Sequence, residues 1–126
     1  MHSCLTYFYV DVSQSTNFNL QQFCTALSLT EDDYLVCGNS NLRIGVNSSY
    51  DVDLNVMARA TLACIWQQRT TLVDLKNHFG LVYYLVRVPQ IYTDCDQPNP
   101  LLSLDADVVA FLHETGTLDD LDYYVY

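Results

Sequence analysis

The run of residues 81–88 constrains most strongly what this chain can fold into. Its sequence, LVYYLVRV, contains one charged residue and neither glycine nor proline. A nearly continuous run of aliphatic, β-branched and aromatic residues is typical of a strand that is covered on both faces. We therefore predict that 81–88 is an internal strand of a sheet, with the rest of the chain arranged around it.

Strand-like and helix-like patterns alternate along the remaining sequence. Residues 5–12, 34–37, 42–46 and 121–126 are rich in β-forming residues, and the turn chemistry of 38–41 (GNSN) predicts a hairpin between the second and third of these strands. Apolar residues at helical spacing predict helices that begin after Asn19, cover 53–67 and 71–79, and run from Ser103 or Asp105 to Gly116. Residues 89–100 hold all three prolines and predict a long loop.

The resulting order of elements, β-α-β-β-α-α-β-α-β, predicts an α+β fold. Its first part matches a ferredoxin-like βαββαβ core, to which a C-terminal helix and strand are added. We expect a mixed or antiparallel sheet with helices packed on it. The chain has 126 residues and no linker-like tract, so we expect a single domain over 1–126.

The cysteines and the lack of long apolar runs bear on location. Five cysteines are an odd number, they are scattered, and none form a CxxC pair. The sequence begins without a basic, apolar leader and contains no 18-residue apolar run. We therefore expect reduced thiols, no membrane span and a cytoplasmic location.

Charge is distributed very unevenly along the chain. Residues 1–87 hold all five basic residues and seven acids, whereas 88–126 hold eight acids and no base. A protein with a net charge of −10 repels nucleic acid, so we expect no nucleic-acid partner. A solvated surface that aids solubility and a docking face for a basic protein both account for this segment.

The docking hypothesis identifies a small set of residues. Asp105 and Asp107 can interact with a helix N-terminus, whereas the other aspartates have no local explanation in the sequence. Tyrosine supplies a large contact area and a hydroxyl, and Tyr123 is expected to pack inward. The expected partner-binding residues are Asp94, Asp96, Asp119, Asp120, Asp122, Tyr124 and Tyr126.

Motifs for catalysis or cofactor binding are missing. The sequence has no GxSxG, no glycine-rich phosphate loop and no closely spaced His or Cys pair for zinc. The sequence around Asp94 and Asp96 starts like a calcium loop, but it lacks the glycine and the glutamate that such a loop requires. We expect no metal, no cofactor and no enzyme activity, although paired carboxylates of a glycosidase are recognised only in space.

The C-terminal half resembles a bacterial domain-of-unknown-function family, the one numbered 4279. The resemblance covers about residues 72–126 and is carried by LKNHFG at 75–80, by LSLD at 102–105 with the helix that follows, and by LDYYVY at 121–126. The chain departs from the family pattern in its middle, where Trp66 lies in a helical pattern rather than in a strand. The resemblance implies a fold rather than an activity, and similar small acidic bacterial proteins include immunity proteins that cover the basic active sites of nuclease toxins.

Three functions are therefore considered. The first is a non-enzymatic acidic binding protein, a candidate immunity or antitoxin protein whose carboxylates stand in for nucleic-acid phosphates on a basic, nuclease-like toxin. The second is a small-ligand-binding domain or enzyme, which a deep pocket with convergent carboxylates favours. The third is a homo-oligomeric adaptor, which an apolar edge strand favours. The sequence does not define the oligomeric state.

Overall fold

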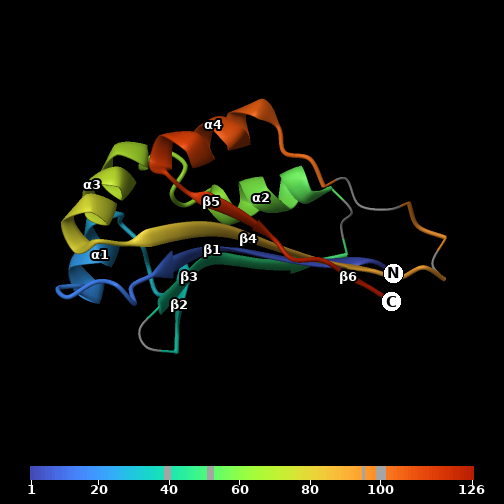
Figure 1. Cartoon of the computed structure of the whole chain (residues 1–126), viewed down its shortest axis with the longest axis horizontal. Coiled ribbons are helices and arrows are strands. Elements are labelled where there is room, and N and C mark those ends of the chain that lie inside the picture. Colours follow the sequence, from blue (N-terminus) through green and yellow to red (C-terminus); the bar gives the residue numbers. More distant parts are fainter. Residues whose placement is uncertain (39–40, 51–52, 95, 99–101) are drawn as a thin grey trace.

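The structure is a computed structural model, and it describes residues 1–38, 41–50, 53–94, 96–98 and 102–126. These residues form a mixed sheet and four helices (Figure 1). The strands are β1 (Ser3–Asp11), β2 (Tyr34–Cys37), β3 (Asn41–Ser49), β4 (Val82–Ile91), β5 (Leu118–Leu121) and β6 (Tyr124–Val125). The helices are α1 (Leu20–Ala26), α2 (Leu54–Leu62), α3 (Arg69–Phe79) and α4 (Ala106–Thr115). The α+β class expected from the sequence is confirmed.

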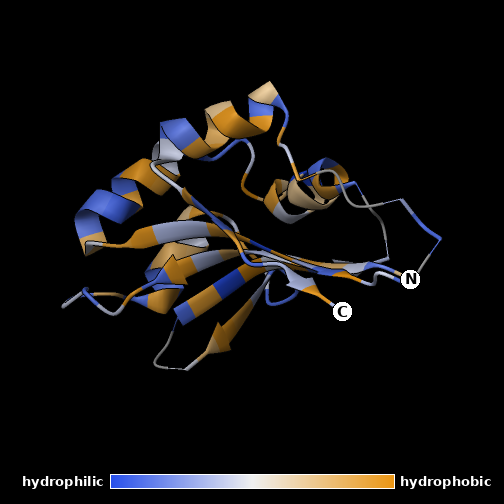
Figure 2. Ribbon diagram, turned by 45° about the vertical axis from the view of Figure 1, so that its right-hand side comes forward, coloured by the Kyte–Doolittle hydropathy of each residue, from blue (hydrophilic) through white to orange (hydrophobic). Residues whose placement is uncertain are grey.

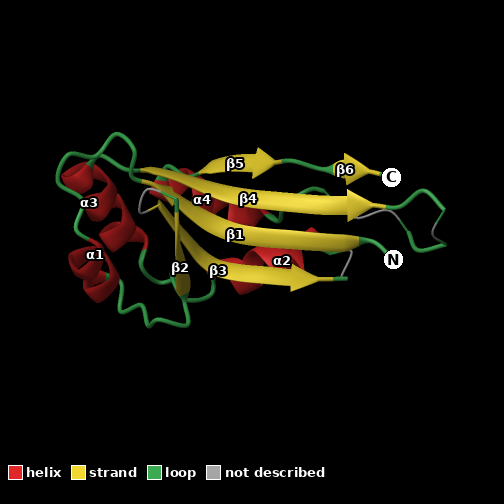
Figure 3. Ribbon diagram, turned by 90° about the horizontal axis from the view of Figure 1, so that it is seen from below, coloured by secondary structure: helices red, strands yellow, loops and turns green. Residues whose placement is uncertain are grey.

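The sheet has the strand order β2-β3-β1-β4-β5, and β6 also pairs with β4 (Figure 3). β1 pairs antiparallel with β3 and with β4, and β2 pairs antiparallel with β3. β5 and β6 run parallel to β4 along its other side. β4 is therefore internal, as the run 81–88 predicts, and the C-terminal segment forms one edge of the sheet.

The main core lies between the sheet and its helices. Figure 1 shows α2 and α4 on one side of the sheet, with α1 and α3 at one end. Phe8, Tyr83, Leu85 and Phe111 are fully buried there, and Tyr83 donates a hydrogen bond from its hydroxyl to the Leu72 carbonyl at 2.7 Å. Hydrophobic and hydrophilic residues alternate along the helices (Figure 2), as expected for elements with one face on a core.

The opposite face of the sheet is not crossed by any of the described helices (Figure 3). Residues of β1 alternate between buried and partly buried, and the partly buried ones face away from the helices. β4 follows the same alternation over Val82–Leu85, but Val86, which also faces away from the helices, is buried at 7% exposure. The prediction that the β4 run is covered on both faces is therefore wrong. On the face without helices, tyrosine and valine side chains of β4 and its neighbours pack against one another, and this mutual packing accounts for the apolar run.

The predicted helix over 53–67 is shorter in the structure. Asp53 caps α2 by accepting hydrogen bonds from the backbone N–H groups of Asn55 and Val56, but the helix ends at Leu62. The next residues form a tight turn, which buries Ile65 completely and stacks the Trp66 ring on Phe111 at a centroid distance of 5.2 Å. Core packing of these two side chains outweighs the helical spacing of the sequence.

Two predicted boundaries around prolines and polar residues are also wrong. β3 extends beyond the predicted strand 42–46 through Asn47, Ser48 and Ser49, because these residues pair with β1. β4 continues through Pro89 to Ile91. Pro89 has no N–H group to donate to a neighbouring strand. On one side of β4, pairing with β5 ends at Arg87 and pairing with β6 begins at Gln90, so no strand pairs with Pro89 on that side and no hydrogen bond is lost there.

Gly45 produces an irregularity in the pairing of β1 and β3. The register shifts between Thr6 and Phe8, so that two residues of β3 lie opposite Tyr7. Gly45 adopts a φ of +63°, and a Cβ atom there would collide with the backbone carbonyl oxygen of Thr61. This is a β-bulge with glycine in the left-handed region, held against α2.

Three helix ends follow the sequence closely, whereas the start of α3 does not. Asn19 caps α1 through its side chain, and Gly80 and Gly116 end α3 and α4 in the left-handed conformation. α3 begins at Arg69, two residues before the helix predicted over 71–79. The Arg69 side chain is fixed there because its guanidinium lies over the Trp66 ring at 4.8 Å.

The C-terminal segment forms two short strands rather than the single strand predicted over 121–126. Tyr123 was expected to pack inward but is 53% exposed, because it lies in the break between β5 and β6. None of the helices in the described ranges has the length and apolarity needed to cross a membrane.

Candidate functional site

The uncovered face of the sheet, which we call the open face, carries a cluster of tyrosines. The strand pairing places Tyr84, Tyr9 and Arg43 side by side on β4, β1 and β3. In the next row, Asp120, Val86 and Tyr7 lie side by side on β5, β4 and β1. Residues two apart in a strand share a face, so these two rows form one continuous surface.

A shallow hollow of about 470 Å³, which we call the Arg43 hollow, lies over these rows. It is lined by Tyr7, Tyr9, Asp11, Arg43, Tyr84 and Asp120, with Val86 in its floor. The guanidinium carbon of Arg43 lies 4.4 Å from the centroid of the Tyr7 ring, and the Tyr9 and Tyr84 rings are tilted against each other at 6.2 Å. Burial, followed by the charge of Asp11, raises the pKa of Tyr9, so its hydroxyl stays protonated and able to donate.

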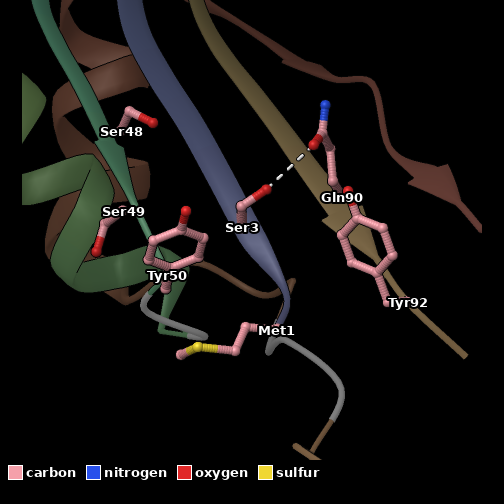
Figure 4. A pocket seen from close by; sticks show the side chains of 7 residues that line it. All are labelled: Met1, Ser3, Ser48, Ser49, Tyr50, Gln90 and Tyr92. Atoms are coloured by element: carbon pink, nitrogen blue, oxygen red, sulfur yellow. Dashed lines mark hydrogen bonds between the residues drawn. The ribbon is translucent and has the colours of Figure 1, made fainter. Parts of the chain in front are cut away.

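A second hollow of about 720 Å³, which we call the Ser3 hollow, lies at the other end of the open face (Figure 4). Its lining includes Tyr50 and Tyr92, on either side of the Ser3 hydroxyl, which donates a hydrogen bond to Gln90 Oε1 at 3.1 Å. The side chains that line it are hydroxyls, an amide, aromatic rings and a methionine. No carboxylate converges there among the residues described, so this hollow does not have the feature that favours an enzyme.

The alternation of β5 separates the predicted aspartates. Asp119 faces the helices, where its carboxylate accepts two hydrogen bonds from Arg87, at 3.0 Å from Nε and 2.6 Å from Nη2. Arg87 is 2% exposed and also donates to the Leu102 carbonyl at 2.7 Å. Asp119 therefore neutralises a buried cation and holds β5 to β4, which the sequence pattern did not indicate.

Asp120 and Asp122 remain on the surface. Asp120 is exposed at the border of the Arg43 hollow, and Asp122 is exposed in the link between β5 and β6. The Tyr124 hydroxyl donates a hydrogen bond to Asp122 at 3.2 Å, and the charge of Asp122 raises the pKa of Tyr124. Tyr124 is 47% exposed and pairs with Gln90, so it lies at the Ser3 end of the same sheet edge.

The contacts of Tyr126 place Asp94 close to this edge. Its ring stacks on Tyr92 at 5.1 Å, and its backbone carbonyl accepts hydrogen bonds from the backbone N–H and the hydroxyl of Thr93. Asp94 follows Thr93 directly and is exposed. From Asp119 opposite Leu85 to Thr93 beside Asp94, the predicted residues thus follow β4 in a stripe of about 25 Å, at roughly 3.3 Å per residue. Asp96 is also exposed, but its neighbour Gln97 forms hydrogen bonds with His2 and Tyr50, so Asp96 is not placed on this stripe.

Arginines from the first part of the chain neutralise other acids of the C-terminal segment. Arg59 on α2 forms ion pairs with Asp105 at 3.0 Å and with Asp107 at 2.6 Å. Arg69 on α3 pairs with Glu114 on α4. Together with Asp119, four of the eight acids in 88–126 therefore have an arginine partner. Asp94, Asp96, Asp120 and Asp122 form no ion pair within the described part of the chain, and we call this set the acidic edge.

The same ranges contain no group of three or more His, Cys, Asp or Glu side chains arranged to hold a metal ion. Cys4, Cys24, Cys37 and Cys64 are free thiols, and Cys95 lies outside the described residues, as do Asn39 and Ser40 of the predicted hairpin turn. Burial raises the pKa of Cys4 to about 11, and it also raises the pKa of Cys24 and of Cys64. These three thiols are therefore weak nucleophiles.

Sequence reasoning missed two residues that shape this surface. Arg43 is the one charged residue in the strand-like run 42–46, and that is the only signal that could have found it. His2 is 1% exposed; its Nδ1 accepts a hydrogen bond from the Tyr92 N–H at 3.0 Å, and its Nε2 lies 3.2 Å from the Gln97 carbonyl oxygen. The ring thus joins the start of β1 to the segment after β4, and no local pattern around His2 predicts this contact.

Comparison of the chain with protein-family models, with curated proteins and with solved structures finds no match. The resemblance to the family numbered 4279 therefore stays a prediction from the sequence.

Proposed function

We propose that this protein is a non-enzymatic binding protein that docks a basic protein through the acidic edge and the adjoining open face. A toxin domain of the nuclease type is the partner that we favour, which makes the chain a candidate immunity or antitoxin protein. The observation that carries the proposal is the set of four exposed aspartates without an ion pair in the described residues. Asp120 and Asp122 lie along one sheet edge, and Asp94 follows the end of β4 beside Thr93, which is hydrogen-bonded to Tyr126. Asp96 lies beyond them, next to Gln97, in a chain whose net charge is −10.

The mechanism is electrostatic steering followed by steric blockade. A negative stripe speeds the encounter with a basic surface, and salt weakens it because the Debye length falls from about 10 Å at 0.1 M to about 3 Å at 1 M. Bound carboxylates then occupy the positions that nucleic-acid phosphates take on a nuclease. Tyr124 and Tyr126 supply aromatic contact area at the end of the stripe, where they are 47% and 58% exposed.

The experiment that tests this proposal is co-purification with the product of the neighbouring gene, followed by charge reversal. Asp120→Lys combined with Asp122→Lys, and separately Asp94→Lys combined with Asp96→Lys, should slow association and weaken its dependence on salt. Asp119 is left intact, because its reversal would place a second positive charge against the buried Arg87. Circular dichroism verifies that each variant is folded.

A matched control separates local from overall charge. Glu31→Lys combined with Asp32→Lys makes the same change in net charge on two exposed acids in the turn before β2. The proposal expects the control to lose much less than the edge variants. Equal losses would reduce the acidic edge to a general solubilising charge, and association that ignores every reversal would contradict the mechanism.

A small-ligand-binding domain is the second candidate function, and the Ser3 hollow is the observation that favours it. Aromatic rings beside hydroxyl and amide groups suit a neutral polar molecule. A homo-oligomeric adaptor is the third, and it is favoured by β2, an edge strand without a charged residue, in which Leu35 and Val36 are 57% and 51% exposed. Sedimentation of the free protein distinguishes the adaptor from the other two.

Two finer expectations belong to the same proposal. We propose that β1, α1, β2, β3, the helical segment α2–α3 and β4 be regarded as a ferredoxin-like unit, which the antiparallel order β2-β3-β1-β4 supports. We also propose a cytoplasmic location, which the four free thiols support.

A further inference from the structure

One positive charge on the open face lacks a counter-ion. Within the described ranges, Arg43 forms no ion pair, and its Nε is buried without a hydrogen-bond partner. By contrast, Arg59, Arg69 and Arg87 each bind a carboxylate. A guanidinium carries five N–H donors, and native structures rarely leave such capacity unused. The Arg43 hollow therefore offers hydrogen-bond donors to an acceptor from outside the chain.

The surroundings of Arg43 define which acceptor fits. The guanidinium lies against the Tyr7 ring, and the side chains of Tyr9 and Tyr84 line the same hollow. Asp11 and Asp120 also line it, so the hollow contains one positive and two negative side chains. A phosphate or another dianion meets repulsion from the two aspartates. A partner that places one carboxylate at Arg43 and positive side chains opposite Asp11 and Asp120 is attracted by all three charged residues of the hollow.

The register gives the spacing of these charges. Asp120 pairs with Val86, and Val86 pairs with Tyr7, over whose ring the guanidinium lies. Two strand spacings of about 4.8 Å therefore separate the backbone of Asp120 from that of Tyr7, over whose ring the Arg43 guanidinium reaches from β3. An acid and a base two residues apart in an extended chain are separated by roughly 7 Å plus the reach of their side chains, which matches that separation.

We propose that Arg43 binds one carboxylate of the basic partner, and that lysine or arginine side chains of the partner on either side of this carboxylate face Asp11 and Asp120. This inference rests on the proposed function, because it assigns a second, central contact to the same partner. Arginine and tyrosine dominate the centres of interfaces, where a planar guanidinium binds a carboxylate through two parallel hydrogen bonds. The acidic edge attracts the partner and the Arg43 hollow fixes its position.

An anchoring role for Arg43 and a purely electrostatic attraction between the two proteins predict opposite effects of removing its charge. Arg43→Gln removes one positive charge, so overall attraction to a basic partner should increase. An anchoring role for Arg43 requires the opposite, a weaker complex that dissociates faster. Arg43→Lys keeps the charge but loses the planar, two-pronged geometry, so it should restore binding only in part.

The first experiment needs no natural partner and uses blocked tripeptides followed by amide NMR. The probe is acetyl-Lys-Gly-Glu-amide, and the matched controls are acetyl-Lys-Gly-Gln-amide and acetyl-Gln-Gly-Glu-amide. We expect saturable shifts at the amides of Tyr7, Tyr9, Arg43 and Tyr84 in the millimolar range for the probe, with several-fold weaker shifts for both controls. Arg43→Gln should abolish the advantage of the probe over acetyl-Lys-Gly-Gln-amide.

Each other outcome overturns the inference without ambiguity. Shifts that follow the acidic edge alone would refute an Arg43 site while leaving the proposed function standing. Equal binding of the probe and of the control that lacks the acid, or no shift at all, would also refute it. With the co-purified partner, Arg43→Gln should raise the dissociation rate about tenfold or more while Arg43→Lys raises it less. Faster association without faster dissociation would show that Arg43 only reduces the overall attraction.

Discussion

Removal of the Asp119 carboxylate is the perturbation that tests the structure most directly. Asp119→Asn preserves the shape of the side chain but leaves the Arg87 guanidinium, whose side chain is 3% exposed, without its counter-ion. Breaking a buried ion pair from one side costs about 3–5 kcal/mol, because the remaining charge stays buried. Asp119 itself is 36% exposed, and Arg87 keeps its hydrogen bond to the Leu102 carbonyl, so we expect a smaller loss of about 2–4 kcal/mol.

Urea unfolding followed by circular dichroism measures this loss as a shift of the transition midpoint at unchanged slope. Asp120→Asn is the matched control, because Asp120 is adjacent to Asp119 on the same strand, is exposed and has no ion pair in the described residues. The control should change the free energy of unfolding by no more than about 0.5 kcal/mol. A double-mutant cycle with Arg87→Met then isolates the coupling of the pair.

A loss below about 1 kcal/mol for Asp119→Asn would refute the reasoning, since surface ion pairs contribute amounts of that size. It would mean that water reaches Arg87 from the β5 side. Asp119 would then return to the set of free carboxylates that the sequence suggests for the docking of a partner.

Three further predictions address other parts of the fold. Gly45→Ala should lower the free energy of unfolding by about 3 kcal/mol or more, because alanine is strained at this positive φ and its Cβ collides with the Thr61 backbone. Urea unfolding measures the loss, and a change below about 1 kcal/mol would contradict the bulge. The hydrogen bonds from Arg59 lower the pKa of Asp107, so this pair stabilises the fold above the unfolded-state pKa of 3.8, and its contribution is lost as pH falls through the lower native value. Asp107→Asn should therefore lower the melting temperature near pH 6 but match the wild type at the acid end of a pH series, and a gap that persists in acid would exclude this linkage. Cys4, whose pKa burial raises to about 11, should resist iodoacetamide at pH 8 in the native protein and react after unfolding, as mass spectrometry of peptides can show; rapid native labelling would show that the β1 end opens.

The sequence identified elements whose signals are local. Asn19, Asp53, Gly80 and Gly116 act at helix ends because their side chains or their backbone freedom satisfy nearby groups, and such contacts depend on a few neighbouring residues. The internal position of β4 could be predicted because an apolar run demands burial wherever it lies.

Elements that depend on distant contacts could not be predicted in this way. The turn after Leu62 exists because Trp66 stacks on Phe111, which lies far along the chain. Pro89 stays in a strand because β5 and β6 leave a gap beside it. Neither partner is visible within a local window of sequence.

The candidate site was predictable only in outline. The excess of acid after residue 88 is visible in the sequence, but composition does not reveal pairing across the fold. Asp119 and Asp120 are adjacent in sequence and lie on opposite faces of the sheet, so one meets Arg87 and the other meets solvent. The alternation of side chains along a strand could have assigned Asp119 and Asp120 to opposite faces only if the sequence had predicted a strand over 118–121.

The late position of β5 and β6 in the chain has a consequence for synthesis. All the partners of β4 on one side, residues 118–125, follow the end of that strand at Ile91 by more than two dozen residues. At about 5–20 residues per second, a ribosome needs roughly 1–5 s to make the intervening segment. During that interval β1, β3 and β4 can already pair, and the outer edge of β4 presents unpaired backbone groups to other nascent chains. Chains released before residue 118 should therefore aggregate through this edge, whereas chains that include β5 and β6 cover it with strands of their own.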